Sequence, residues 1–220
     1  MNMVTYLHMI YPDSKLEEKL WGEGYEVVVG IDEVGRGPLA GPVAAGAVAF
    51  TKDCKVVEGV RDSKTLSVRQ KNSLYDQIKN TVKGYGVGMV SEKEIDEIGI
   101  QMAVLKAMTL ALRQVEEMIG RRADYLIVDG VNVELIGEYP TMKMSKGDQK
   151  HYSISAASIL AKVDRDNLMI KYSEKYPEYG FERNMGYGTK EHMDALKEYG
   201  VCDIHRRSYR PVAKCVKEGI

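Results

Sequence analysis

VVVGIDEVGRGPLAGPVAAGAVAF, residues 27–50, is the stretch from which the fold of this chain can be worked out. Its apolar, β-branched beginning, residues 27–31, predicts a buried strand followed by two adjacent carboxylates, Asp32 and Glu33. A glycine-rich turn then leads to a second apolar run, residues 43–50, and so short a connection favours antiparallel pairing of the two strands. The two carboxylates either lie in solvent at the sheet edge or are held there by a cation.

Hydrophobic periodicity and capping signals predict the remaining elements on both sides of this stretch. Further strands are expected at residues 84–90, 125–128 and 141–144, and helices at residues 12–22, 67–80, 92–119, 155–172 and 189–199. Because a long helix precedes the strand at 125–128, we expect that strand to run parallel to the first. We predict one α/β domain over residues 1–220, with an N-terminal helical extension at 1–24 and a basic C-terminal segment at about 200–220.

The sequence also predicts the capping residues or the buried side of three of these helices. Ser67 with Gln70, and Ser91 with Glu94, match the capping-box pattern. The helix at 92–119 has an apolar stripe that predicts a core-facing side. Its members are Ile95, Ile98, Met102, Leu105, Leu112, Val115 and Ile119. The buried side of the helix at 155–172 is expected at Ile154, Ala157, Ala161 and Leu168.

Composition excludes several classes of protein. The formal net charge of −1 points to neither a nucleic acid nor a membrane as partner. Three cysteines without CxxC spacing indicate neither a disulfide framework nor a zinc site. No apolar run is long enough to span a bilayer and no secretory signal is visible, so we expect a cytoplasmic protein. The basic residues after His205 are interpreted as a solvated tail; they are Arg206, Arg207, Arg210, Lys214 and Lys217.

Four carboxylates are expected to converge. Asp32 and Glu33 follow the first strand, Asp129 follows a parallel neighbour, and Asp148 precedes a helix. Parallel neighbours end at the same sheet edge, where open α/β sheets bind ligands. Gathered there, the four acids would repel one another unless two divalent cations offset them, and all-oxygen ligands favour magnesium or manganese. Four acids around two metals suit phosphodiester hydrolysis. The alternative is four solvated acids at strand ends and turns.

The turn after Glu33 adds weight to the prediction of a functional site beside the acids. Gly35 and Gly37 would let backbone amides approach a ligand closely, and Arg36 adds a positive charge beside the acids. An ordinary tight turn explains the same glycines. Several lysines could line an approach for a polyanion, although each alone also fits a plain surface position. They are Lys64, Lys143, Lys146, Lys150 and Lys162.

Taken together, these segments resemble the ribonuclease HII family, in its bacterial form. The matching segments, in the family's order, are residues 30–43 (GIDEVGRGPLAGPV), 62–66 (DSKTL), 128–130 (VDG), 146–148 (KGD), 154–163 (ISAASILAKV), 186–192 (GYGTKEH) and 205–208 (HRRS). Arg36 and the short segment before the first strand favour this family over the related ribonuclease HIII, which has a Gly-Lys-Gly motif and an added N-terminal domain.

The resemblance implies a ribonuclease H-like fold, a five-stranded mixed β-sheet flanked by α-helices, with C-terminal helices. It implies an endoribonuclease that hydrolyses the RNA strand of RNA/DNA hybrids and nicks on the 5′ side of ribonucleotides embedded in duplex DNA, leaving 3′-hydroxyl and 5′-phosphate ends. The implied role in the cell is removal of misincorporated ribonucleotides. The implied cofactor is Mn²⁺ or Mg²⁺, with two ions in the catalytic complex. A monomer is expected, and the last ten residues carry no clamp-binding peptide.

The resemblance also assigns residues to roles. The catalytic and metal-binding acids fall on Asp32, Glu33, Asp129 and Asp148. The motif that reads the 2′-hydroxyl falls on Gly35, Arg36 and Gly37, the junction-sensing tyrosine on Tyr187, and further substrate contacts on Ser63 and Lys64. For His192 and His205 we expect structural hydrogen bonds, and for Asp164 and Asp166 a place on the helix surface or pairing with Arg or Lys.

Two other functions must be weighed. A non-catalytic nucleic-acid-binding protein of this fold would lack at least one of the four acids, and all four are present. A small-molecule phosphotransferase would carry GxxxxGK[ST] or GxGxxG between a strand and a helix, and neither pattern occurs. The sequence therefore favours the metal-dependent endoribonuclease.

Overall fold

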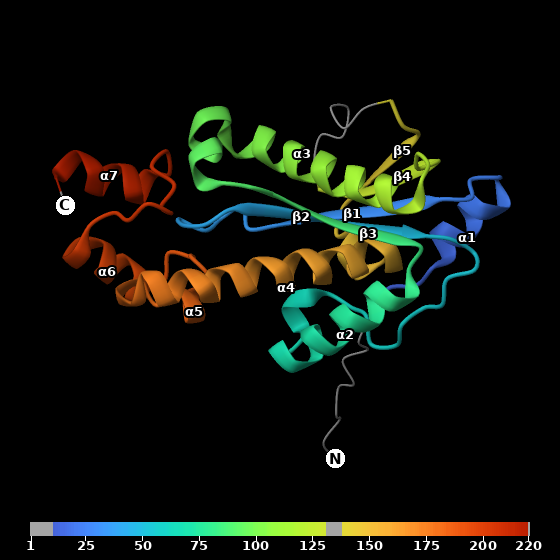
Figure 1. Ribbon diagram of the computed structural model, residues 1–220, viewed down its shortest axis with the longest axis horizontal. Helices are drawn as coiled ribbons and strands as arrows, with labels where there is room; N and C mark the ends of the chain where they lie inside the picture. Colours follow the sequence, from blue (N-terminus) through green and yellow to red (C-terminus); the bar gives the residue numbers. More distant parts are fainter. Residues whose placement is uncertain (1–10, 131–137, 220) are drawn as a thin grey trace, which may run out of the picture.

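A computed structural model describes residues 11–130 and 138–219 of the chain (Figure 1). The strands are β1 (Val28–Val34), β2 (Val43–Phe50), β3 (Gly84–Val90), β4 (Tyr125–Asp129) and β5 (Thr141–Met144). The α-helices are α1 (Lys15–Gly22), α2 (Val68–Thr81), α3 (Glu92–Ile119), α4 (Tyr152–Lys175), α5 (Phe181–Asn184), α6 (Lys190–Tyr199) and α7 (Arg210–Glu218). Short 3₁₀ turns are η1 (Ser63–Thr65), η3 (Gly147–Gln149) and η4 (Pro177–Tyr179).

The strands form one mixed five-stranded sheet in the order β3-β2-β1-β4-β5. β2 pairs antiparallel with β1 and with β3, whereas β4 pairs parallel with β1 and with β5. The expected fold class and the expected parallel pairing of β1 with β4 are therefore confirmed. β1 is longer than expected and continues through Asp32 and Glu33, because β2 supplies pairing partners opposite both residues, Gly46 and Ala45.

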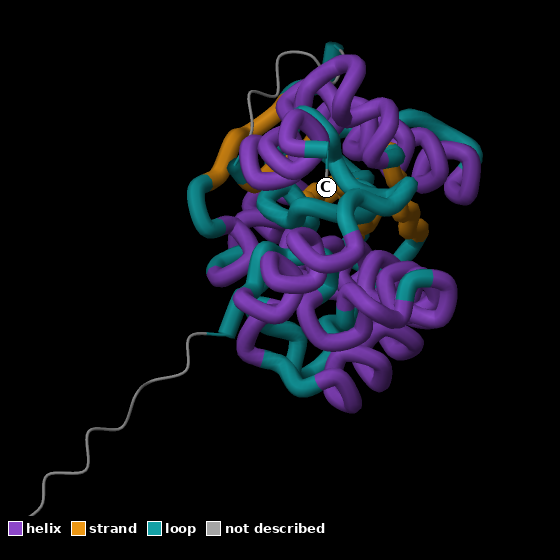
Figure 2. Tube along the Cα trace, turned by 90° about the vertical axis from the view of Figure 1, so that its left-hand side faces the viewer, coloured by secondary structure: helices purple, strands orange, loops and turns teal. Residues whose placement is uncertain are grey.

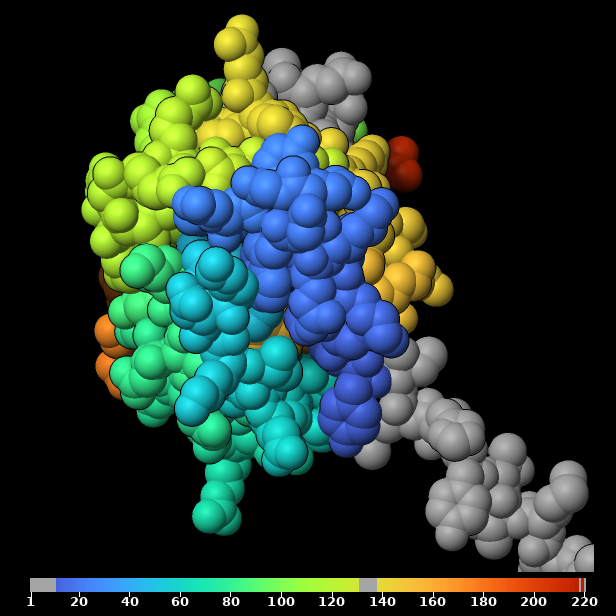
Figure 3. All heavy atoms as spheres, turned by 90° about the vertical axis from the view of Figure 1, so that its right-hand side faces the viewer, coloured from blue at the N-terminus to red at the C-terminus, as the bar shows by residue number. Residues whose placement is uncertain are grey.

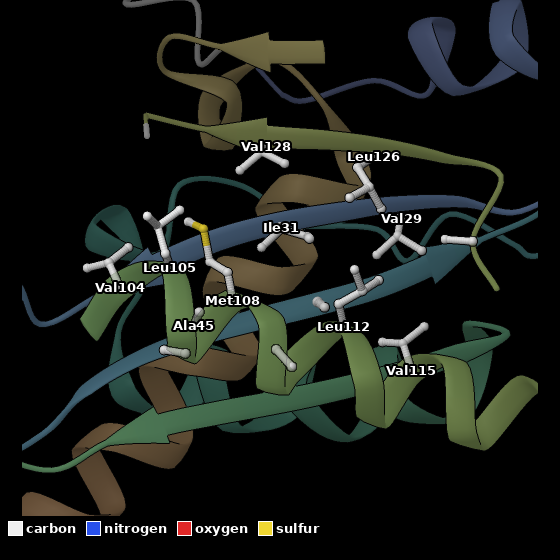
Figure 4. Close-up of a cluster of buried hydrophobic side chains, with 14 of the residues drawn as sticks. Val29, Ile31, Ala45, Val104, Leu105, Met108, Leu112, Val115, Leu126 and Val128 are labelled. Atoms are coloured by element: carbon white, nitrogen blue, oxygen red, sulfur yellow. The ribbon is translucent and has the colours of Figure 1, made fainter. Parts of the chain in front are cut away.

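Helices α3 and α4 cover opposite faces of the sheet (Figure 1). On the α3 side, apolar residues of β1, β2 and β4 meet those of α3 in one buried cluster (Figure 4). Glycines in β3 let the helix backbone come close. A Cβ atom added at Gly86 would lie 2.3 Å from the carbonyl oxygen of Ala111, and one at Gly88 would lie 2.1 Å from that of Ala107. Alternating glycines therefore make a smooth surface against which α3 packs.

The stripe predicted for α3 is partly wrong. Gly99 has φ 77° and ψ 155°, which interrupts the helical backbone inside α3. Because of this break, Ile98 and Met102 are 39% and 48% exposed, while the later members of the stripe pack on the sheet. The start of the helix is also only half as expected. Ser91 accepts the backbone N–H of Glu94, but the Glu94 carboxylate pairs with Lys106 instead of closing the capping box.

The other helices follow the predictions with local changes. α2 begins with the complete Ser67–Gln70 capping box. α4 begins at Tyr152, earlier than predicted, and its buried side includes Met169, whereas Leu168 is only half-buried.

Residues 1–10 of the expected N-terminal extension lie outside the described residues. The described part of the extension forms α1, whose buried Glu17 accepts hydrogen bonds from the backbone N–H and the hydroxyl of Ser153 at 2.9 and 2.7 Å. Together with the segment after β2, it covers one end of the molecule (Figure 3). A pocket of about 630 Å³ lies at this end, lined among others by Trp21, Tyr25, Thr51 and Lys83. The pocket is lined by none of the four acids expected to be catalytic.

Helices α5, α6 and α7 lie at the opposite end (Figure 2). The expectation of a solvated basic tail is wrong in part, because Arg206 is fully buried and His205 is buried as well. Within residues 11–130 and 138–219, no helix is long and apolar enough to cross a membrane.

Candidate active site

The structure brings the four predicted acids into one neighbourhood. Ile31 pairs with Val128, so Asp32 and Glu33 lie next along β1 at the point where β4 ends on Asp129. A Cβ atom added at Gly130, directly after β4, would lie 3.8 Å from Glu33 Oε1. The fourth acid, Asp148, is held near Asp129 by backbone hydrogen bonds. Asp129 Oδ2 accepts hydrogen bonds from the amides of Gly147 at 3.0 Å and Asp148 at 3.5 Å.

Three of these carboxyl groups titrate abnormally. Burial, and then the negative charge of Glu33, raise the pKa of Asp32 well above its usual value, and Asp129 and Asp148 act in the same direction. Burial raises the pKa of Glu33, although Arg36 opposes this rise. Burial followed by the charge of Asp62 raises the pKa of Asp148, against the effect of Lys64. The acids therefore repel one another, as expected for a site that takes up positive charge.

Each carboxylate also has a nearby partner within the chain. Glu33 Oε1 accepts from Arg36 at 3.1 Å, and Lys64 Nζ lies 3.9 Å from Asp148 Oδ2. Asp32 Oδ1 accepts the backbone N–H of Glu33 at 2.8 Å. Among the described residues, no three His, Cys, Asp or Glu side chains stand ready as a ligand set. The donor set nevertheless fits a hard divalent cation, since it offers carboxylate oxygens that are crowded, mostly buried and mutually repulsive.

Ser63 of the Asp-Ser-Lys motif reaches the acids indirectly. It is buried, and its hydroxyl lies 3.2 Å from that of Ser158 on α4. Ser158 in turn hydrogen-bonds the Asp32 carboxyl group and lowers its pKa, against the larger effect of burial. Lys64, by contrast, is exposed and borders Asp148. The motif therefore supports Asp32 through Ser63 and places the exposed ammonium group of Lys64 beside Asp148.

The Gly-Arg-Gly turn lies beside the acids and has two different glycines. Gly35 has φ +90°, and a Cβ atom there would lie 2.4 Å from Nε of the buried Arg165, so the chain itself requires glycine. At Gly37 a Cβ atom would meet only the ring of Tyr187, at an ordinary 3.6 Å. The Tyr187 side chain is 43% exposed. The turn and the tyrosine, predicted from separate motifs, are therefore neighbours on an accessible surface.

Two buried arginines hold the loop that follows the turn. No role was expected for Arg165, and Arg206 was expected in a solvated tail. Arg165 donates to the carbonyl oxygens of Pro42 (2.9 Å), Met185 (3.0 Å) and Ala40 (3.2 Å). Burial lowers its pKa to about 10, so it stays charged at neutral pH. The burial of Arg165 could have been predicted from the sequence. It lies four residues after Ala161 and eight after Ala157, on the predicted buried side of the helix.

Arg206 is the second of these arginines. It donates to the carbonyl oxygens of Gly35 at 2.7 Å, Arg36 at 3.0 Å and Gly41 at 2.9 Å. It also donates to the Tyr209 hydroxyl, which in turn donates to the Arg36 carbonyl oxygen at 2.5 Å. Burial lowers the pKa of Arg206. The turn between the acids and the tyrosine is thus held from its buried side by the N–H donors of the Arg206 guanidinium.

The structure confirms the hydrogen-bonding role predicted for the two histidines. His192 Nδ1 lies 2.9 Å from the Tyr187 carbonyl oxygen, and its Nε2 lies 2.9 Å from His205 Nε2. His205 Nδ1 accepts the backbone N–H of Cys202 at 3.0 Å. Burial lowers the pKa of both imidazoles, that of His205 to about 3. Both rings are therefore neutral at physiological pH.

The remaining predicted residues take structural places. Asp164 accepts from the Tyr75 hydroxyl at 2.7 Å. Asp166 pairs with Lys71 at 3.3 Å and Lys162 at 2.6 Å, as expected of a structural acid. Lys162 is therefore committed to Asp166 rather than lining an approach to the site. Lys143, Lys146 and Lys150 are exposed, like Lys64.

A five-stranded sheet in this order, with carboxylates where β1 and β4 end, defines the ribonuclease H-like class of fold. A family model for ribonuclease HII matches residues 29–212. The ribonuclease HII of Enterococcus faecalis is 44% identical over 199 residues, which cover 90% of this chain and 75% of that protein. The chain therefore belongs to the ribonuclease HII family and is a ribonuclease H.

Several solved structures share the fold, and two of them are compared with this chain. The ribonuclease H2 from Pyrococcus horikoshii superposes with a TM-score of 0.73 at 30% identity, covering 87% of this chain and 98% of that one. The ribonuclease HII in a complex with PCNA from Archaeoglobus fulgidus gives 0.70 at 25% identity, covering 84% and 95%. Members of the family depend on divalent metal ions and cleave RNA in RNA/DNA hybrids.

Proposed function

We propose that this ribonuclease H also nicks duplex DNA on the 5′ side of a single embedded ribonucleotide, and that it thereby removes misincorporated ribonucleotides. One observation supports this proposal above all. The Gly-Arg-Gly turn, next to Glu33, and the exposed ring of Tyr187 form one continuous surface, with 3.6 Å between the ring and a Cβ atom added at Gly37. A surface beside the acids that contacts two successive sugars could recognise an RNA-to-DNA junction.

The proposed catalytic residues are Asp32, Glu33, Asp129 and Asp148, which would hold two Mn²⁺ or Mg²⁺ ions. Such ions supply an activated water molecule and charge stabilisation for phosphodiester hydrolysis, with 3′-hydroxyl and 5′-phosphate products. The residues fit because their oxygens are crowded and three of their pKa values are raised. Release of Glu33 from Arg36 would free the carboxylate and leave the guanidinium available to a phosphate.

Substrate contacts are proposed for Gly35, Arg36, Gly37 and Tyr187, together with Lys64, and indirectly for Ser63. The absence of any steric demand for glycine at Gly37 supports direct approach of a sugar to that backbone. The exposed ring of Tyr187 is free to stack. Ser63 is buried, and its contact with Ser158 supports a role in orienting Asp32 rather than in touching the substrate.

The proposed partner is the nucleic acid itself, acted on by a cytoplasmic monomer. The Archaeoglobus fulgidus relative was solved together with PCNA.

A cleavage assay tests the proposed function. Wild-type protein with Mg²⁺ or Mn²⁺ is expected to nick an end-labelled duplex that carries one ribonucleotide, to leave an all-DNA duplex intact, and to lose activity on addition of EDTA. Mapping of the ends should give a 3′-hydroxyl at the nick. Cleavage of long hybrids without any nick at the single ribonucleotide would contradict the proposal.

Tyr187 has its own test. The Tyr187→Ala variant should lose more activity on the duplex with one ribonucleotide than on a long hybrid, because only the first substrate has a deoxynucleotide directly after the ribonucleotide at the cleaved bond. A stacked base or sugar contributes about 1–3 kcal/mol, which corresponds to a roughly 5- to 150-fold selective loss. Equal losses on the two substrates would remove the junction-sensing role.

A further inference from the structure

A short segment near the C-terminus contacts both recognition elements at once. Residues 204–206 run antiparallel to the loop after the Gly-Arg-Gly turn, with a bridge between His205 and Ala40. The amide of Gly41 donates to the Ile204 carbonyl oxygen at 2.8 Å, and the amide of Arg206 donates to that of Leu39 at 2.8 Å. We name residues 204–206 the strap.

The Arg206 side chain fixes the direction of the turn. It binds the carbonyl oxygens of Gly35 and Arg36, which therefore point toward the buried guanidinium. In a trans peptide the N–H points away from the C=O of the same unit. The amides of Arg36 and Gly37 therefore face the opposite side, and among the described residues neither amide finds an acceptor. Two unpaired donors are thus aimed outward by one buried side chain.

The His205 side chain extends the strap to the tyrosine. A carbonyl oxygen can only accept, so His192 donates from Nδ1 to the Tyr187 carbonyl. Neutral His192 must then accept at Nε2, so His205 donates from Nε2 and accepts the Cys202 amide at Nδ1. Only one arrangement of protons satisfies all three bonds. The chain runs from the strap to the backbone of Tyr187.

Further contacts join the same two loops. The amide of Leu39 donates to the Gly186 carbonyl oxygen at 2.7 Å, and Arg165 binds the carbonyl oxygens of both Ala40 and Met185. The loop that carries Tyr187 is therefore held against the loop that follows the turn by backbone and side-chain bonds. The distance between these two loops is therefore set by these hydrogen bonds rather than by surface contacts.

We propose that the strap sets the distance and orientation between the outward amides of the turn and the Tyr187 ring, with Arg206 and His205 as positioning residues. This spacing determines how well the enzyme distinguishes a single embedded ribonucleotide from a long hybrid. The inference rests on the proposed function, because it assumes that the turn and the tyrosine contact successive nucleotides. It adds a specificity role for two residues that are buried and do not touch the substrate.

Two variants of matched polarity test the His205 bond. In His205→Gln, the amide nitrogen can occupy the position of Nε2 and keep the donor to His192. In His205→Asn, the shorter amide reaches only the position of Nδ1 and loses that donor. Both are assayed for kcat and KM on the one-ribonucleotide duplex and on a long hybrid, with thermal midpoints measured in parallel.

We expect His205→Asn to lower the preference for the one-ribonucleotide duplex over the long hybrid by about 10-fold, since ångström-scale misplacement can cost up to about 100-fold. His205→Gln should restore most of the preference. In a Tyr187→Ala background, His205→Asn should cause little further change in preference, because the effect acts through that ring. Equal losses on both substrates for His205→Asn, or additive losses of preference in the double variant, would overturn the proposal.

The controls separate this proposal from the proposed function. A wild-type enzyme that never nicks at a single ribonucleotide would refute the proposed function before any variant is compared. A wild-type enzyme that nicks normally, with a His205→Asn variant of unchanged preference and normal thermal midpoint, would refute the strap alone. Arg206→Lys tests the other positioning residue, because one ammonium cannot reproduce the fork of N–H donors. Its preference for the one-ribonucleotide duplex should fall as in His205→Asn, and an unchanged preference in a folded Arg206→Lys protein would remove Arg206 from the proposal.

Discussion

The protein has two interiors of opposite chemistry. The α3-side interior, between α3 and the sheet, consists of apolar side chains and of glycines that face alanine carbonyls. The C-terminal interior, around Arg165, Arg206, His192 and His205, consists of buried polar side chains that bind backbone carbonyls or one another. The first interior holds the sheet that carries the acids, and the second directs the loops that would meet the substrate.

The difference follows from what each interior has to stabilise. Packing against a sheet is non-directional, so shape and apolar area suffice. A recognition turn has carbonyls that must be satisfied when buried, and satisfying them with fixed donors also determines where its amides point. Among the described residues, neither buried arginine hydrogen-bonds to an Asp or Glu, and each binds three backbone carbonyls instead. If the two interiors are separable, a variant in one should leave the role of the other intact.

The largest expected effect is on the α3-side interior. Gly88→Val would place its Cβ 2.1 Å from the Ala107 carbonyl oxygen, which is far closer than van der Waals contact allows. We expect the free energy of unfolding to fall by about 3 kcal/mol or more, measured by urea denaturation. Gly22→Ala is the matched control, because a Cβ there meets nothing within 4 Å. A Gly88→Val protein as stable as the wild type would contradict the close packing.

The next effect concerns the C-terminal interior. Arg165→Met leaves the carbonyl oxygens of Ala40, Pro42 and Met185 without their guanidinium donor. At about 1–3 kcal/mol for each buried unsatisfied group, with some relaxation, we expect a loss of about 2–4 kcal/mol in stability. Variants that remain folded should also cleave poorly, because the turn is no longer held. Full activity combined with lowered stability would show that this interior supports the fold alone.

Replacing one of the acids should raise the stability of the protein and abolish its activity. The pKa of Asp32 is raised in the folded state, so its ionised form destabilises the fold as pH rises through that pKa, and the penalty is complete above it. Asp32→Asn should therefore raise the free energy of unfolding by about 1–2 kcal/mol at pH 8 without divalent ions, while abolishing cleavage. Thermal unfolding in EDTA measures the first effect. A lower thermal midpoint for the variant would contradict the repulsion between the acids.

The smallest expected effect on stability is at the boundary of the α3-side interior, between the exposed Met102 and the buried Met108. Met102 is 48% exposed because Gly99 interrupts the helix, whereas Met108 is fully buried. Met102→Ala should change stability by less than about 0.5 kcal/mol, and Met108→Ala should lower it by about 3 kcal/mol. Equal losses in urea denaturation would mean that the helix packs along its whole length, as its periodicity alone suggests.

The sequence was informative where hydrophobic pattern and chain order decide the result. Strand positions and the parallel pairing of β1 with β4 followed from apolar runs and one crossover, and the ends of those strands located Asp32 and Asp129. Periodicity failed around Gly99, because its φ of 77° interrupts the helical backbone, and Ile98 before it and Met102 after it are exposed. Residue type also misled, since Arg206 belongs to a basic run and is nevertheless fully buried.

The C-terminal interior could not be predicted because its partners are distant in sequence. The contact from Arg206 to Gly35 spans 171 positions, and that from Arg165 to Ala40 spans 125. Local pattern carries no information on which carbonyl a buried guanidinium will find. Only the helical spacing of Arg165 after Ala157 and Ala161 indicated burial, and the family resemblance gave roles to the turn and to Tyr187 without naming what holds them.

The central claim, that the acids at the ends of β1 and β4 form one metal-dependent hydrolytic site, is tested most directly by a single comparison of rates. Asp129→Asn and the exposed, distant Asp53→Asn are assayed with saturating Mn²⁺ on the duplex with one ribonucleotide. We predict a loss of at least about 100-fold for Asp129→Asn, which corresponds to about 2.7 kcal/mol of barrier, and a wild-type rate for Asp53→Asn. Near-normal cleavage by Asp129→Asn would contradict the assignment of the site.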